Sequence, residues 1–102
     1  MAIAVSTTNL DTSINSLTIG VVIITIPNPA ADVQYGTSVP CRTCWVSLNT
    51  GTHDFYVDGT TATTGTAYKI AAAWEKEIQI DDINKLHFIG TAGEKIQVLY
   101  RN

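Results

Sequence analysis

Alternating apolar and polar positions are the main local signal in this chain. Isoleucine, valine and threonine are frequent, and clusters of Gly, Asn, Asp and Thr interrupt them repeatedly, a rhythm typical of all-β domains. Strands are predicted over residues 2–8, 17–26, 33–39, 43–48, 55–57, 77–81, 85–89 and 94–100. Residues 68–76 form the one candidate helix, but they lack a clear N-cap and are interpreted as a strand end followed by a turn. The pattern predicts an all-β fold, a single antiparallel β-sandwich or jelly-roll-like domain of about eight or nine strands.

The segment 17–26 is the longest apolar run and the most informative predicted strand. Side chains alternate between the two faces of a strand. The odd-numbered face is assigned to the core and carries Leu17, Ile19, Val21 and Ile23. The even-numbered face is apolar toward its C-terminal end, where it carries Val22, Ile24 and Ile26. Two interpretations of this second face stay open: burial within the monomer, including a bulge that exchanges the faces, or exposure as a subunit interface, since exposed apolar patches mark contacts.

Composition adds one point to this picture. Charged residues make up 15% of the 102 residues and the net charge is -3, whereas typical soluble domains contain roughly 25% charged residues. An acidic chain with few charges argues against a nucleic-acid partner. Such a surface suits a protein that lies against neighbouring subunits.

The length fits one domain, which we assign to residues 17–102. Residues 1–16 are interpreted as an N-terminal arm or first short strand, with the hypothesis that they reach a neighbouring subunit. The start lacks the basic and long apolar regions of a secretory signal. The longest apolar run is also shorter than the ~20 residues of a membrane-spanning helix. We therefore expect synthesis in the cytoplasm and no membrane partner.

Cys41 and Cys44 form a Cys-x-x-Cys motif. Structural zinc usually needs four ligands, and His53 and His87 lack the paired spacing that would complete the set. A redox motif of this kind opens a helix, whereas here it leads into a predicted strand. We interpret the cysteines as two small thiols in or near the core, and expect no metal and no cofactor.

Sequence motifs that are typical of catalytic sites give little support to an enzymatic function. The sequence has no Gly-rich phosphate loop and no Ser/His/Asp order around a nucleophile elbow. Asp54 and Asp58 share one side of a predicted strand, which by itself favours neither a cation site nor an acid–base pair. We therefore expect no catalytic residues.

Aromatic side chains supply the remaining candidates. Trp45 is predicted to fill the core from its strand. Trp74 lies in a predicted turn, where it is either half-buried structure or, if exposed, a contact anchor. Candidates for a carbohydrate-binding face are Tyr35, Tyr56 and Tyr68, although their spacing does not require one. The predicted subunit or capsid interface consists of Val22, Ile24, Ile26, Tyr68 and Trp74.

A series of turn and strand motifs runs through residues 33–101. In order, these motifs are Val39-Pro40-Cys41-Arg42, Asn49-Thr50, Tyr56-Val57-Asp58-Gly59, Glu77-Ile78-Gln79-Ile80, Asp82-Ile83-Asn84-Lys85-Leu86, Ile89-Gly90, Ala92-Gly93 and Val98-Leu99-Tyr100. Their order and spacing resemble small virion structural proteins of tailed bacteriophages. The sequence departs from that pattern at residues 72–76, where Ala-Ala-Trp-Glu-Lys replaces a Pro-Gly or Ala-Gly turn.

The resemblance implies a capsid decoration (cement) protein. Such a protein is made in the host cytoplasm, binds the outside of the assembled major-capsid shell as a homotrimer, and stabilises the shell by mass action. The major capsid protein would be its partner. Two alternatives stay open: a tail, neck or fibre-associated virion protein, and a carbohydrate-binding module that attaches particles to surface glycans.

Overall fold

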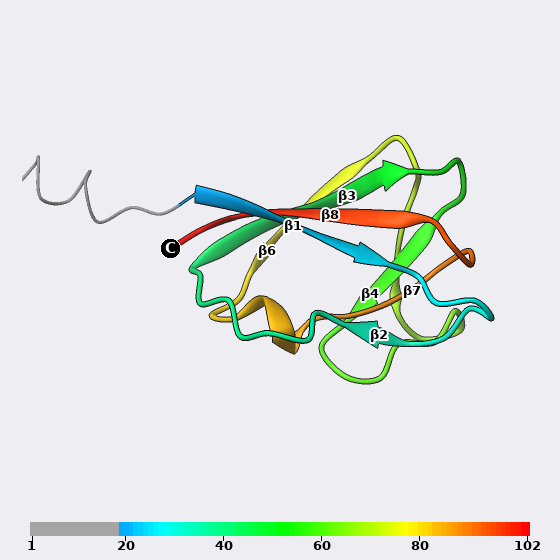
Figure 1. The fold of residues 1–102 in the computed structure, drawn as a ribbon, viewed down its shortest axis with the longest axis horizontal. Helices are drawn as coiled ribbons and strands as arrows, with labels where there is room; N and C mark the ends of the chain where they lie inside the picture. The colour runs from blue at the N-terminus through cyan, green and yellow to red at the C-terminus, as the bar shows by residue number, and fades with distance from the viewer. Residues whose placement is uncertain (1–18) are drawn as a thin grey trace, which may run out of the picture.

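The computed structural model of this chain describes residues 19–102. This part of the chain forms two four-stranded antiparallel sheets (Figure 1). Their elements are β1 (Ile19–Thr25), β2 (Val33–Gln34), β3 (Thr43–Thr50), β4 (Phe55–Asp58), β5 (Tyr68–Ile70), β6 (Glu75–Gln79), the 3-10 helix η1 (Ile83–Lys85), β7 (His87–Ile89) and β8 (Lys95–Arg101). The predicted all-β class is confirmed. The predicted strand over residues 2–8 and the arm over residues 1–16 lie outside the described residues.

We call the two sheets sheet 1 and sheet 2. Sheet 1 has the strand order β1-β8-β3-β6, and sheet 2 has the order β2-β7-β4-β5. Of the consecutive strand pairs, β4 and β5 alone lie in the same sheet, so every other connection between described strands crosses from one sheet to the other. Both sheets contribute side chains to one buried cluster.

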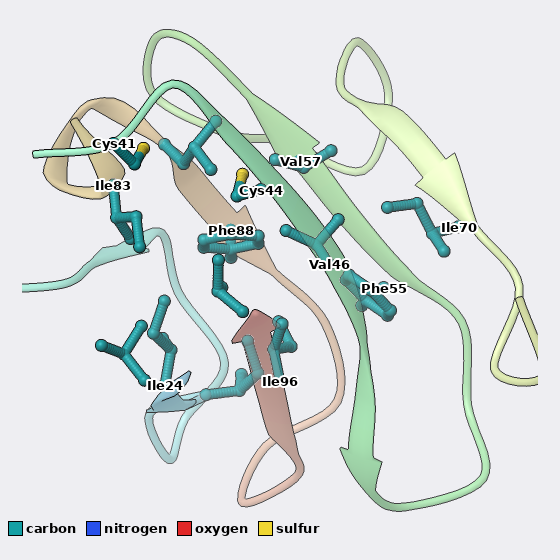
Figure 2. Packing of buried hydrophobic residues seen from close by; sticks show 14 residues of the cluster. Ile24, Cys41, Cys44, Val46, Phe55, Val57, Ile70, Ile83, Phe88 and Ile96 are labelled. Carbon is teal, nitrogen blue, oxygen red and sulfur yellow. The ribbon is translucent and has the colours of Figure 1, made fainter. Parts of the chain in front are cut away.

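The core lies between the sheets and takes side chains from both. Figure 2 shows Val46 and Ile96 of sheet 1 together with Phe55 and Phe88 of sheet 2 in one apolar cluster. All four are essentially inaccessible to solvent. Burial of such a side chain stabilises the fold by about 1.5–3 kcal/mol, so this cluster holds the two sheets together. Ile83 of η1 is also fully buried, and the helix thereby closes one end of the core.

The two faces of β1 are the reverse of the prediction. Val22, Ile24 and Ile26 are buried in the core, whereas Ile19, Val21 and Ile23 are exposed. The reason lies in the neighbouring strand β8. Because Val22 pairs with Val98 and Ile24 pairs with Ile96, the even-numbered face joins the apolar inner face of β8. Ile19 and Ile23 instead stand beside Arg101 and Gln97. The assignment of Val22, Ile24 and Ile26 to a subunit or capsid interface is therefore wrong.

The prediction that Trp45 fills the core is also wrong. In β3 the neighbours Cys44 and Val46 are completely buried, so the alternation of the strand places Trp45 on the outer face, where it is half-buried. Trp45 pairs with Leu99 on one side and with Glu77 on the other. Its apolar ring thus lies on the outer surface of sheet 1.

The segment 68–76 is a strand end followed by a turn, as predicted. Tyr68–Ile70 forms β5, the amide of Trp74 donates a hydrogen bond to the carbonyl of Ala71 at 2.9 Å, and β6 begins at Glu75. Elsewhere the boundaries differ: the strand predicted over 33–39 is reduced to Val33–Gln34, and η1 occupies the start of the strand predicted over 85–89.

Asp82 fixes η1 to the segment that precedes β3. Its carboxylate accepts hydrogen bonds from the amides of Val39 at 2.9 Å and Asn84 at 3.0 Å, and from the Ser38 hydroxyl. The Ser38 hydrogen bond, followed by the backbone bond from Asn84, lowers the pKa of this carboxyl. Asp82 is thus an N-cap that also binds a segment more than 40 residues earlier in the chain.

Candidate interaction surface

The outer face of sheet 1 carries an apolar strip. We define the outer strip as Ile19, Val21 and Ile23 of β1, Leu99 of β8 and Trp45 of β3. Ile19, Val21 and Ile23 are 68%, 57% and 42% exposed, and Leu99 is 38% exposed. The register places Val21, Leu99 and Trp45 in one row across three neighbouring strands. The side chains of the strip therefore adjoin one another on a single face.

Polar side chains border the outer strip. Arg101 stands beside Ile19, and Glu77 stands beside Trp45. Gln97, which lies beside Ile23, donates a hydrogen bond to the Ser47 hydroxyl at 2.9 Å and accepts one from Asn49 at 3.1 Å. An apolar centre with a polar border is the usual anatomy of a protein interaction site.

A second exposed region lies at the other edge of sheet 1. Tyr68 and Trp74 are 58% and 69% exposed, so of the two interpretations left open for Trp74 the structure shows the exposed one. The Lys76 ammonium lies 5.2 Å from the centre of the Tyr68 ring, so a cation–π contact joins β6 of sheet 1 to β5 of sheet 2. Because β1 and β6 are opposite edges of the sheet, these aromatic residues are not part of the outer strip.

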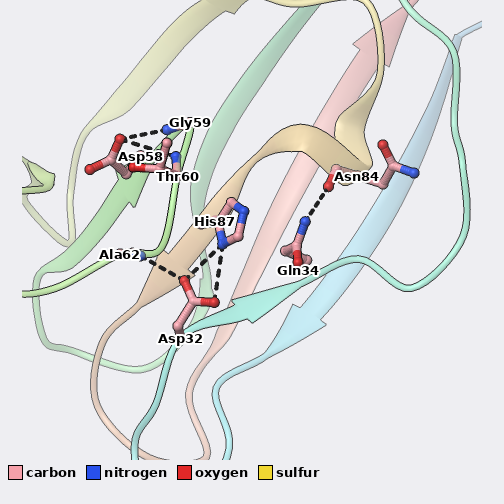
Figure 3. A network of polar contacts seen from close by, with 8 residues as sticks. All are labelled: Asp32, Gln34, Asp58, Gly59, Thr60, Ala62, Asn84 and His87. Carbon is pink, nitrogen blue, oxygen red and sulfur yellow. Dashed lines mark hydrogen bonds and ion pairs between the residues drawn. The ribbon is translucent and has the colours of Figure 1, made fainter.

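A polar cluster lies on the outer side of sheet 2 (Figure 3). The Asp32 carboxylate accepts a hydrogen bond from the amide of Ala62 at 2.7 Å and lies 3.0 Å from Nδ1 of His87. His87 and Asp32 are mostly buried. Asp32 therefore joins three segments that are far apart in sequence, a structural role that needs no ligand.

The remaining contacts of this cluster are also local or structural. Asp58 accepts hydrogen bonds from the amides of Gly59 at 2.7 Å and Thr60 at 3.3 Å, which closes the turn after β4. Gln34 donates a hydrogen bond to the carbonyl of Asn84 at 2.8 Å. In residues 19–102, no three His, Cys, Asp or Glu side chains come together in a way that could hold a metal ion.

Cys41 and Cys44 are free, buried thiols, in agreement with the interpretation of the sequence. Burial raises the pKa of Cys44 to about 12, and it also raises the pKa of Cys41, whose Sγ donates a hydrogen bond to the carbonyl of Ile80 at 3.2 Å. The thiolate is the reactive form of cysteine. The raised pKa values favour the protonated thiol at neutral pH, which is the less reactive form.

Sequence reasoning missed the outer strip, although β8 contained a signal for it. In β8, Ile96 and Val98 are buried and Lys95, Gln97 and Arg101 are not. This alternation identifies the outer face of the strand, and Leu99 is the apolar exception on it. Which face of β1 is exposed can be inferred only once its pairing with β8 is known.

Comparisons of the sequence with protein-family models and with curated proteins found no match. Among residues 19–102, no helix has the length and apolar character needed to cross a membrane. The outer strip is thus the main observation on which a function can be argued.

Proposed function

We propose that this protein is a structural protein of a bacteriophage virion, a capsid decoration protein that binds the outside of the assembled major-capsid shell. In this proposal its two sheets form a jelly-roll-like β-sandwich. The observation that carries the proposal is the outer strip, an apolar surface with a polar border on a stably packed domain. The order of turn motifs in the sequence supplies the virion context.

The outer strip supports binding for an energetic reason. Full burial of an Ile, Val or Leu side chain is worth about 1.5–3 kcal/mol, so covering the exposed part of each aliphatic residue of the strip contributes about 1 kcal/mol. Several such contacts around the half-buried ring of Trp45 form the kind of apolar centre that dominates protein interfaces. The bordering Arg101 and Glu77 have opposite charges and would orient the domain on its partner.

A protein that binds only the assembled shell stabilises that shell by mass action, by an amount that grows with its free concentration relative to Kd. No reactive group is needed for this mechanism. The low charge of the chain keeps the electrostatic cost of close approach between many copies small.

Two measurements test the proposal. Purified protein is added to shells of its phage that lack it, and the shells are sedimented and heated. We expect saturable co-sedimentation and a higher melting temperature of the shell as occupancy rises. In purified virions we also expect a copy number comparable to that of the major capsid subunit. A copy number of only a few per virion, or no binding to shells, would overturn the proposal.

The exposed aromatic side chains favour a second candidate function. Tyr68 and Trp74 offer ring faces at the β5 and β6 edges, and such rings commonly bind the apolar faces of sugars. In this alternative the domain attaches particles to surface glycans. Binding on a glycan array that disappears in Trp74→Ser would support it, and a blank array would count against it.

A further inference from the structure

The outer edge of β1 has a backbone that no described strand covers. We propose that β1 pairs antiparallel with β1 of a second copy, around a twofold axis at Val22. This contact would join the two copies of sheet 1, each of four strands, into one continuous sheet. The inference goes beyond the proposed function, because it concerns the association of the chain with itself.

The hydrogen bonds of Ile26 show which backbone groups of β1 point outward. Its amide donates to the carbonyl of Glu94 at 2.9 Å and its carbonyl accepts from the amide of Gly93 at 2.9 Å, so both groups face β8. Backbone groups alternate in direction along an antiparallel strand. The even-numbered residues of β1 therefore face β8, and the backbone groups of the odd-numbered residues face the free edge: Ile19, Val21, Ile23 and Thr25.

These outward groups are self-complementary. Around a twofold axis at Val22, Val21 of one copy pairs with Ile23 of the other, and Ile19 pairs with Thr25. Each of these pairs joins odd-numbered residues, so outward backbone groups meet outward backbone groups along the whole strand. Four such pairs supply about eight hydrogen bonds between the copies. The same register aligns the outer faces, so the two outer strips become one.

The charges of the edge strands explain why the partner is a second β1. β1 contains no charged residue and no proline, so pairing with itself brings no like charges together. β6 contains Glu75, Lys76 and Glu77, and pairing β6 with itself around Glu77 would bring two carboxylates face to face. Contact of β1 with β6 of the next copy would be head-to-tail and would not close in general, whereas a twofold contact ends with two copies.

The edges of sheet 2 are poorer candidates because they are short. β2 has two residues and β5 has three. Natural proteins protect long edge strands with charges, prolines or bulges. β1 has seven residues and contains neither a charged residue nor a proline. The expected oligomer therefore contains two copies, instead of the three that the resemblance to decoration proteins implies.

The test uses two variants of the full chain at the same exposed positions. In Val21→Glu + Ile23→Lys, the proposed register places each introduced carboxylate opposite an introduced ammonium of the other copy. In Val21→Lys + Ile23→Lys, it places ammonium opposite ammonium at both pairs. Both variants lose the same apolar side chains, and both should fold, because the two positions are on the outer face. Light scattering over a concentration series measures the mass of each.

We expect a mass of two chains for the wild type and for the Glu/Lys variant. The Lys/Lys variant should have a dissociation constant at least about tenfold higher, because like charges directly opposite one another are destabilising. A monomeric wild type at 100-micromolar-scale concentration would overturn the proposal. Equal dissociation constants for the two variants would also overturn the proposal. That result would mean that β1 does not pair with a second β1, because only that register distinguishes the Glu/Lys variant from the Lys/Lys variant. Shell binding is measured separately, so failure of this pairing leaves the proposed function standing.

Discussion

The two edge strands of sheet 1 differ sharply in chemistry. β1 reads Ile-Gly-Val-Val-Ile-Ile-Thr and has no charge, whereas β6 reads Glu-Lys-Glu-Ile-Gln and is exposed along most of its length. Charges on an edge strand block unwanted pairing. β6 is therefore a protected edge, and β1 is an edge that has kept its capacity to pair. The two edges of sheet 1 thus differ in charge and exposure, and only β1 lacks the charges that block pairing.

The largest expected effect separates the two faces of β1. Val22→Lys + Ile24→Lys puts two ammonium groups into the core, where Ile24 is 3% exposed. Uncompensated buried charges each cost several kcal/mol, which exceeds much of the stability of a small domain. We expect the variant to be unfolded, as measured by circular dichroism and chemical denaturation.

The matched control places the same charges on the outer face. Val21→Lys + Ile23→Lys should remain folded, with a change in the free energy of unfolding of less than about 1 kcal/mol, as is usual for surface substitutions. A folded inner-face variant would contradict the burial of the even-numbered residues. An unfolded outer-face variant would contradict the exposure of the odd-numbered ones.

The next prediction removes the protection of β6. Glu75→Val + Glu77→Val replaces both carboxylates with β-branched apolar side chains on an exposed edge, which favours pairing with other chains. We expect association that grows with concentration, seen as rising mass in light scattering. Glu75→Gln + Glu77→Gln is the control, because it removes charge without adding apolar surface, and we expect weaker association. An unchanged mass in the valine variant would contradict the prediction that the charges of β6 prevent association through this edge.

Acid should weaken the contact between Glu94, before β8, and the loop after β3. The backbone of Glu94 bonds to Ile26, and its carboxylate accepts hydrogen bonds from His53 Nδ1 at 2.9 Å and from the amides of Thr52 at 3.0 Å and His53 at 3.3 Å. These bonds, the His53 side chain first, hold the pKa of the Glu94 carboxyl below its ordinary value of 4.5. Because the folded-state pKa is the lower one, this stabilisation is complete above pH 4.5 and is lost as pH falls through the folded-state value.

Urea unfolding between pH 6 and pH 3 measures this effect. Glu94→Gln should have a free energy of unfolding that depends less on pH below pH 4.5 than that of the wild type. Some dependence should remain in the variant, because the pKa of Asp82 is also lowered, mainly by the hydrogen bond from Ser38. Identical pH profiles for the variant and the wild type would refute a role for Glu94.

The smallest expected effect concerns the aromatic contact at the β6 edge. Lys76→Gln removes the ammonium that lies 5.2 Å from the centre of the Tyr68 ring, at an exposed site where such contacts contribute about 0.5 kcal/mol. Thermal denaturation should show a slightly lower melting temperature, whereas Lys76→Arg should retain most of the stability. Equal losses in both variants would contradict the prediction, because Lys76→Arg keeps a positive charge over the Tyr68 ring.

Strand positions could be predicted from the sequence because alternation is a local signal. The orientation of β1 could not, because both of its faces are apolar and only the pairing of Val22 with Val98 decides which one is inside. The position of Trp45 depends in the same way on the burial of Cys44 and Val46. Contacts such as Asp32 with His87 join residues 55 positions apart and leave no trace in local spacing.

The candidate surface was therefore only partly predictable. The turn within residues 68–76 could be predicted from their composition, whereas the exposure of Trp74 was one of two open interpretations that only the structure decides. The outer strip depends on a register between three strands that are far apart in the sequence, and no local pattern contains that register. The prediction placed a candidate contact surface on the face of β1 that the structure buries in the core.

In the proposed function the outer strip binds the capsid shell, and a matched pair of variants tests this role. Leu99→Glu places a charge in the strip, and Trp74→Glu places the same charge on an exposed apolar residue outside it. Titrated against shells in a sedimentation assay, Leu99→Glu should bind at least about tenfold more weakly than the wild type, a loss of about 1.4 kcal/mol, and Trp74→Glu should bind normally. Normal binding of Leu99→Glu, with or without a loss in Trp74→Glu, would contradict the account.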